Sequence, residues 1–234
     1  MKYLFITFFV LSFAFESQAQ KRKDYIVTLN TTKGTMHMVL YDETPLHKAN
    51  FINLVKENFY DSLLFHRVME NFMIQGGDPN SKTAKKGDKL GNGGANLTKI
   101  PYEFTNERVH KKGALAMASN GNAEKMSSGC QFYIVQGRKY VDEELTKVEK
   151  ANNVSYSPKQ RADYMAVGGT PFLDNRYTVF GEVLDNFGVI DTIVGVSKDG
   201  NNRPDEDIKM SMTLKKVRKR KITKLYGFTY PKKK

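Results

Sequence analysis

Residues 65–79 read FHRVMENFMIQGGDP and carry the clearest structural signals of the sequence. This stretch overlaps a run of apolar and β-favouring residues from Leu63 to Met69, which predicts a strand. A second short apolar segment runs from Phe72 to Gln75, and the sequence Gly76-Gly77-Asp78-Pro79 is typical of a turn. The stretch therefore predicts a strand and a short apolar segment that ends at a glycine-rich turn.

Further short strands are predicted on both sides of this stretch. The β-favouring runs are residues 25–30, 35–41, 113–118, 131–135, 177–183 and 210–217. One helix is expected to begin at Thr44, with Pro45 in its first turn, and to end near Asn58. A second helix is expected from Val189 to Val194, because the apolar residues there recur at helical spacing. Many short strands and two helices predict a mainly β fold, a closed barrel capped by the helices.

The chain divides into three parts by composition. Residues 1–19 have the pattern of a signal peptide, residues 20–217 form one domain, and residues 218–234 form a basic tail. Within the domain, residues 139–169 are polar and charged, and Ser157-Pro158 resembles a helix start. This segment predicts a helical insertion between two strands, and its sequence leaves open whether it is a functional lid or an inert addition.

The N-terminus has the pattern of an export signal. Lys2 precedes a mostly apolar run from Tyr3 to Phe15, and polar and small residues follow up to Ala19. The run is shorter than the roughly 20 residues that span a bilayer, which favours cleavage near Ala19 over an uncleaved membrane anchor. We expect export to a bacterial periplasm, with a eukaryotic secretory lumen as the alternative.

The net charge of +12 is concentrated at the C-terminus. From Lys215 to Lys234 there are ten basic residues and no acidic residue, so the rest of the chain is close to neutral. This pattern favours a solvated or loosely packed tail, with weak contact to an anionic surface as the alternative. Tyr226, Phe228 and Tyr230 alternate in the tail, which would allow part of it to pack as a strand. No nucleic-acid partner is expected.

Several kinds of site are excluded. The single cysteine, Cys130, rules out an internal disulfide and is expected to be a buried, inert thiol. The four histidines lack metal-ligand spacing, so no metal ion or other cofactor is expected. The sequence Gly91-Asn92-Gly93-Gly94 lacks the features of a phosphate loop and is expected to be a flexible loop.

An ordered series of motifs carries a resemblance to a known family. The motifs are FHRV-x-x-x-FM-x-QGGDP at residues 65–79, AMA at 116–118, SGCQFY at 128–133, PFLD at 171–174 and YTVFGEV at 177–183. In this order they resemble the cyclophilins, a family of peptidyl-prolyl cis-trans isomerases, from Tyr25 to about Val217 outside the insertion. The resemblance implies a closed eight-stranded antiparallel barrel and polypeptide substrates with X-Pro bonds.

Rotation about an X-Pro bond needs neither a nucleophile nor a metal. The barrier of about 18–20 kcal/mol comes from amide resonance, and rotation frees the lone pair of the imide nitrogen. The charged, rigid guanidinium of Arg67 is suited to donate a hydrogen bond to that lone pair. Because side chains alternate in a strand, Phe65 and Arg67 are expected to share one face, with His66 on the other. The resemblance implies that the Arg67 face lines an outer groove.

The resemblance also assigns roles by position. The catalytic group it implies consists of Arg67, Gln75 and Gln131. The pocket for the proline ring would be formed by Phe72, Met73, Tyr133 and Leu173. The segment that pairs with the substrate backbone as an added strand would be Ala118, Ser119 and Asn120. The remaining substrate-binding residues would be His66, Phe172 and Tyr177.

Three positions depart from the family pattern. Tyr133 stands where phenylalanine is usual, so its hydroxyl needs a hydrogen-bond partner or water. Phe172 stands where well-known members have tryptophan, and Tyr177 where they have histidine. These changes bear on substrate preference and on the binding of cyclosporin-like peptides more than on the isomerase chemistry.

Two functions are compatible with this fold. One is an isomerase that assists the folding of exported proteins, since uncatalysed X-Pro isomerisation takes tens of seconds. The alternative is a non-catalytic chaperone or a module that binds proline-containing peptides. The joint presence of Arg67, Phe72 and Gln75 favours the enzyme, which we expect to act as a monomer.

Overall fold

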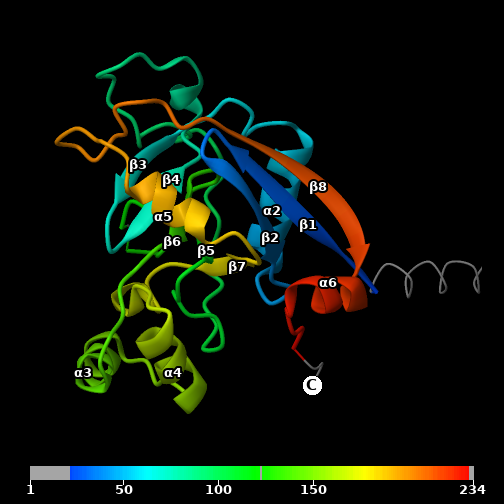
Figure 1. Ribbon diagram of the computed structural model, residues 1–234, viewed down its shortest axis with the longest axis vertical. Coiled ribbons are helices and arrows are strands. Elements are labelled where there is room, and N and C mark those ends of the chain that lie inside the picture. Colours follow the sequence, from blue (N-terminus) through cyan, green and yellow to red (C-terminus); the bar gives the residue numbers. More distant parts are fainter. Residues whose placement is uncertain (1–21, 122, 232–234) are drawn as a thin grey trace, which may run out of the picture.

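Eight strands form one antiparallel sheet in the computed structural model, which describes residues 22–121 and 123–231 (Figure 1). The strands are β1 (Lys23–Thr31), β2 (Gly34–Leu40), β3 (Phe65–Met69), β4 (Met73–Gly76), β5 (Ala114–Met117), β6 (Phe132–Val135), β7 (Val179–Val183) and β8 (Met210–Arg218). Their order in the sheet is β3-β4-β6-β5-β7-β2-β1-β8. The predicted signal peptide lies outside the described residues.

The sheet is curled but open, so the prediction of a closed barrel is not confirmed. The edge strands β3 and β8 share no ladder and are joined by an isolated bridge between Leu64 and Lys209. Three backbone hydrogen bonds support this junction: Phe65 N to Ile208 O (3.0 Å), Met210 N to Leu63 O (2.8 Å) and Ser62 N to Met210 O (2.9 Å). The prediction of a mainly β, eight-stranded antiparallel fold is confirmed.

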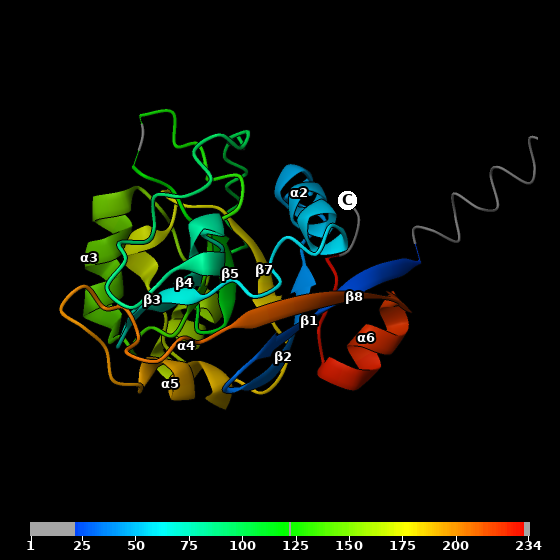
Figure 2. The same ribbon diagram turned by 90° about the horizontal axis from the view of Figure 1, so that it is seen from above.

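Two helices cover the apolar interior of the curled sheet. Helix α2 (Pro45–Lys56) begins after Thr44, as predicted, and contacts β7 and β8. Helix α5 (Gly188–Val194) contacts β2, β3 and β4 (Figure 2). Their buried side chains are those of His47, Phe51, Ile52, Leu54, Val55, Ile190, Ile193 and Val194. No helix in the described part of the chain combines the length and hydropathy needed to cross a bilayer.

The insertion between β6 and β7 is helical, as predicted. It contains α3 (Asp142–Asn152) and α4 (Pro158–Ala166), which lie together at one end of the molecule (Figure 1). The Ser157 side chain caps α4 by accepting a hydrogen bond from the backbone N–H of Gln160. A separate small core forms where the insertion packs on Val109 of the domain. The insertion contributes Tyr140, Leu145, Tyr156 and Tyr164 to this core.

The C-terminal segment packs on the domain, so the prediction of a loose tail is wrong for residues 219–230. Helix α6 (Lys219–Tyr226) buries Ile222, and Phe228 stacks on Tyr41 with 6.3 Å between ring centres. The segment is amphipathic, and burial of its apolar side chains offsets the cost of ordering it.

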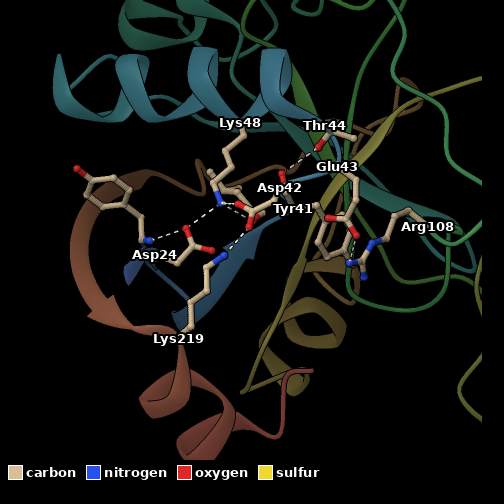
Figure 3. Close-up of polar contacts among 10 residues, drawn as sticks. Asp24, Tyr41, Asp42, Glu43, Thr44, Lys48, Arg108 and Lys219 are labelled. Carbon is tan, nitrogen blue, oxygen red and sulfur yellow. Dashed lines mark hydrogen bonds and ion pairs between the residues drawn. The ribbon is translucent and has the colours of Figure 1, made fainter. Parts of the chain in front are cut away.

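Ion pairs fix this segment to the start of the domain, as Figure 3 shows. Lys219 Nζ lies 2.5 Å from Asp42 Oδ2. Lys48 Nζ lies 2.7 Å from both Asp42 Oδ1 and Asp24 Oδ1, which ties α2 to β1. Part of the charge of the basic segment is therefore neutralised within the domain.

Candidate active site

Strand register places three of the predicted site residues side by side. Arg67 of β3 pairs with Gln75 of β4, and Gln75 pairs with Tyr133 of β6. Ala116 of β5 pairs with Tyr133 in turn. Since neighbouring strands lie about 5 Å apart, this row spans a surface large enough for a few residues of a peptide.

Arg67 lies on this outer face because β3 is bulged. The register of β3 against β4 shifts between Phe65 and Arg67. Phe65 points into the core, where its ring lies 6.0 Å from that of Phe132, whereas Arg67 is half-exposed. The prediction that Phe65 and Arg67 share a face is wrong, because a bulge adds one residue to the alternation.

The guanidinium of Arg67 is held from two sides. Its Nη1 donates to Oε1 of Gln75 at 3.3 Å, and its carbon lies 5.8 Å from the centre of the Phe72 ring. Nε2 of Gln75 donates in turn to Oε1 of Gln131 at 3.2 Å. The three residues predicted to be catalytic thus form one hydrogen-bonded chain. A guanidinium has five N–H donors, so one bond to Gln75 leaves donors for a substrate.

A glycine loop anchors the far end of this chain. Nε2 of Gln131 donates to the carbonyl oxygens of Gly91 (3.0 Å) and Gly93 (2.9 Å). Both glycines donate their backbone N–H groups to the buried carboxylate of Asp78. A side chain cannot be accommodated at Gly93, where a Cβ would lie 1.8 Å from Oδ1 of Asp78. The prediction of a flexible loop is wrong for these two glycines, because their backbone is bonded on both sides.

The residues predicted to hold the proline ring belong to one apolar cluster beside Arg67. Its buried members include Met73, Tyr133 and Leu173. The partly buried side chains that pack against them include Phe72, Ala118 and Tyr177. Phe172 is 43% exposed, and its ring lies 5.8 Å from that of Phe72. The arrangement provides an apolar surface next to a fixed cationic donor.

The hydroxyl of Tyr133 has a buried partner. It lies 2.9 Å from Nε2 of His110, whose ring is stacked on that of Tyr133. Nδ1 of His110 lies 2.6 Å from Oδ1 of Asp174. Burial raises the pKa of Tyr133 well above its usual value, and Tyr177 and Asp174 raise it further, so the phenol stays protonated. The departure from phenylalanine is therefore accommodated by a hydrogen bond.

His66 is not brought together with the other predicted binding residues. It is 5% exposed and lies near Asp78 and Gly91. Burial lowers its pKa to about 4, so the ring is neutral at physiological pH.

The segment predicted to pair with the substrate backbone is only partly suited to that role. Ala118 already donates its N–H to Gln131 O (2.8 Å), and its carbonyl accepts from Ser128 N (2.7 Å). Ser119 and Asn120 lie beyond the end of β5 and line a cavity of about 300 Å³. This cavity is also lined by Gln75 and Gln131, so it adjoins the arginine chain.

Three supporting residues were missed at the sequence level. Asp78 and Asp174 lie in the motifs that carried the family resemblance, yet neither was given a role. His110 was set aside because it lacks metal-ligand spacing, although the structure places it against a carboxylate. A charged residue just beyond an apolar strand could have indicated Asp78, which follows β4 closely, whereas His110 and Asp174 have no such position.

Comparisons with known proteins show which family the chain belongs to. The profile of the family "Cyclophilin type peptidyl-prolyl cis-trans isomerase/CLD" matches residues 26–214. A Streptococcus pyogenes protein, named as a bifunctional phosphatase and peptidyl-prolyl cis-trans isomerase, is 39% identical over 78% of this chain and 37% of its own length. A Staphylococcus haemolyticus protein, named as a peptidyl-prolyl cis-trans isomerase, is 32% identical over 78% of this chain and 86% of its own. The chain thus spans well under half of the streptococcal relative and most of the staphylococcal one.

Solved structures show the same fold. The crystal structure of a Cryptosporidium parvum cyclophilin type peptidyl-prolyl cis-trans isomerase superimposes with a TM-score of 0.58 at 24% identity, covering 82% of this chain and 98% of that one. A crystal structure obtained in the presence of the dipeptide Ala-Pro gives a TM-score of 0.57. With the profile match over most of the chain, the chain belongs to the family of cyclophilin-type peptidyl-prolyl cis-trans isomerases.

Proposed function

We propose that this protein isomerises X-Pro bonds of exported polypeptides, with Arg67 as the electrostatic catalyst. The observation that carries the proposal is the position of the Arg67 guanidinium. It is bonded to Gln75 and lies against Phe72, at the border of the apolar cluster. A proline ring on the cluster would bring its imide nitrogen near the remaining donors of the arginine.

The chemistry follows from this arrangement. Apolar contact with Met73, Tyr133 and Leu173 holds the ring while the preceding carbonyl group rotates. As the bond twists, the imide nitrogen becomes pyramidal and its lone pair becomes available. The guanidinium then donates to that lone pair, and this bond is stronger in the transition state than in either planar isomer. Gln75 and Gln131 keep the arginine in place, so little reorganisation is needed.

The proposal that the substrate contains proline has independent support. The Cryptosporidium parvum structure was obtained in the presence of a dipeptide that ends in proline, and that protein shares the present fold. The cavity beside Gln75 and Gln131 offers space for residues that precede the proline.

The experiment compares the mature protein with Arg67→Ala and Arg67→Lys. Cis-trans exchange of an X-Pro peptide would be followed by NMR exchange spectroscopy, and peptide binding by titration. Loss of one preorganised donor should lower kcat/KM by about 10²–10³, with peptide affinity changed only a few-fold. Arg67→Lys should recover part of the rate, because lysine keeps the charge but not the rigid fork. Equal turnover by wild type and Arg67→Ala would refute catalysis by Arg67, and binding without turnover in both would favour the non-catalytic chaperone.

Export to a periplasm remains part of this proposal, and the pattern of residues 1–19 supports it. Expression of the full chain in a bacterial host, followed by fractionation and N-terminal sequencing, tests it. A mature N-terminus near Gln20 in the periplasmic fraction is the expected result. An intact N-terminus in the cytosol would contradict it.

Weak contact with an anionic surface is also proposed. The end of β8 and helix α6 expose the basic side chains of Lys215, Lys216, Arg218, Arg220, Lys221 and Lys224. Leu225 on the same helix is 58% exposed, so the helix presents an apolar side chain among basic ones. This composition suits a membrane surface with anionic headgroups.

A further inference from the structure

Asp174 joins the helical insertion to the proposed proline site. It follows Leu173 directly in the chain and is 4% exposed. Its Oδ1 accepts from the backbone N–H of His110 at 2.9 Å and lies 2.6 Å from Nδ1 of that ring. Its Oδ2 accepts from the hydroxyls of Tyr156 (2.7 Å) and Tyr164 (2.6 Å). These four contacts engage both carboxylate oxygens of Asp174.

The chain of contacts continues through the ring of His110. Nδ1 of His110 lies 2.6 Å from Oδ1 of Asp174, and Nε2 of the same ring lies 2.9 Å from the hydroxyl of Tyr133. Burial raises the pKa of both Tyr156 and Tyr164, so their hydroxyls keep the protons that they donate to Asp174. Hydrogen bonds therefore run without interruption from the insertion to Tyr133.

A second contact comes from the C-terminal end of α3. Nδ2 of Asn152 donates to the carbonyl oxygen of Phe172 at 3.0 Å and approaches that of Pro171 at 3.4 Å. These residues belong to η2 (Pro171–Leu173), the short turn that presents Phe172 and Leu173 to the site. The insertion thus holds the turn η2 in two ways. Asn152 binds the backbone of the turn, and Tyr156 and Tyr164 bind the side chain of Asp174, which directly follows the turn.

The groups that make these contacts are themselves fixed. The Tyr156 backbone N–H donates to Oε1 of Glu149 at 2.7 Å. Oε2 of Glu149 lies 2.6 Å from Nη1 of Arg161 in α4, so the two helices are tied at this point. Tyr164 is fully buried in the insertion core. An insertion of this rigidity can act as a support rather than as a mobile lid.

We propose that the insertion is a positioning element for the proline site. Its residues Tyr156, Tyr164 and Asn152 hold Tyr133 and the turn η2 in the geometry that binds the proline ring. Removal of these polar groups should weaken peptide binding and leave the Arg67 step intact. An inert addition would not change binding when these contacts are removed. The inference rests on the proposed function, since it takes the apolar cluster to be the proline site.

The test uses the double variant Tyr156→Phe/Tyr164→Phe, with Asn152→Ala as a second, independent variant. Tyr140→Phe is the matched control, because Tyr140 lies in the same insertion core but is not among the described partners of Asp174. Leu145→Val is the stability control, because it thins that core and leaves the three polar groups in place. Each protein is measured well below its melting temperature for kcat, KM and Kd toward one X-Pro peptide. The methyl signals of Leu173 report the local geometry in the free enzyme.

The double variant should raise KM and Kd roughly tenfold, as expected for loss of hydrogen bonds to a buried carboxylate, with kcat within about twofold. Asn152→Ala should raise both in the same direction, and the Leu173 methyl shifts should change in both variants. The two controls should leave KM and Kd unchanged. Wild-type affinity in the double variant would overturn the inference, as would an equal loss of affinity in Leu145→Val. A wild-type protein without turnover would refute the proposed function instead, and Kd would still decide the inference.

Discussion

Replacement of Asp78 by asparagine should destabilise the protein and slow catalysis at a distance from the substrate. The carboxylate is fully buried and accepts backbone N–H bonds from Asn80, Gly91 and Gly93. Asparagine offers one acceptor oxygen, and its own N–H groups would face at least one of these donors. An unsatisfied buried donor costs about 1–3 kcal/mol, so we expect a loss of roughly 2–4 kcal/mol in the free energy of unfolding. For a chain of this size, that corresponds to a decrease in Tm of roughly 5–15 °C.

The effect on catalysis follows from the glycine loop. Gly91 and Gly93 present their carbonyl groups to Gln131, which holds Gln75 beside Arg67. A looser loop should misplace the guanidinium and lower kcat/KM roughly tenfold, since small displacements of a catalytic group have large effects.

Two measurements check this prediction. One is kcat/KM on an X-Pro peptide, and the other is hydrogen exchange of the Gly91 and Gly93 amides, which should become faster in Asp78→Asn. Asp88→Asn is the control, because Asp88 lies in an exposed turn of the same segment and undergoes the same chemical change. Wild-type kcat/KM together with faster amide exchange would show that the loop does not position the arginine. Unchanged exchange would refute the assigned role of the carboxylate.

Three further predictions concern pH, charge and the Tyr133 hydroxyl. Because burial lowers the pKa of His66 from 6.5 to about 4, the unfolded state binds more protons in this range. The free energy of unfolding should therefore fall as the pH drops from 6.5 to 4, by up to about 3 kcal/mol from this residue, and urea titrations of His66→Leu should show a shallower fall. Substitution of Arg220, Lys221 and Lys224 by glutamine should weaken binding to anionic vesicles by about 1 kcal/mol per charge, leaving kcat/KM unchanged; equal sedimentation with vesicles would exclude α6 as the contact. Tyr133→Phe should leave Nε2 of His110 without its hydrogen-bond partner and lower the free energy of unfolding by about 1–2 kcal/mol, and an unaltered thermal melt would argue against that hydrogen bond.

Local signals predicted most of the secondary structure. Pro45 after Thr44 marked the start of α2, and Ser157-Pro158 marked the start of α4, because both dipeptides act within one helical turn. The face of Arg67 was predicted incorrectly, since a bulge depends on how β3 pairs with β4 and not on β3 alone.

Long-range contacts account for the other differences. The basic segment was expected to be loosely packed because of its composition, yet Lys219 pairs with Asp42, 177 residues earlier in the chain. Likewise, the carboxylate that contacts the His110 ring cannot be identified from the residues next to His110, because it belongs to Asp174, 64 residues away in the chain. Closure of the barrel is also a long-range property, since it depends on whether β3 and β8 form a ladder at the two edges of the sheet.

Two buried carboxylates support different parts of the proposed site. Asp78 fixes the glycine loop that leads to Gln131, Gln75 and Arg67, whereas Asp174 fixes the turn that carries Leu173. Neither carboxylate lies in the row of outward-facing residues, and both oxygens of each carboxylate form hydrogen bonds within the protein. Such buried networks are rigid, because each unmade bond would leave a charge uncompensated. An enzyme that stabilises only a transient lone pair depends on donors that are already in place, and buried acids that do not contact the substrate are well suited to hold them there.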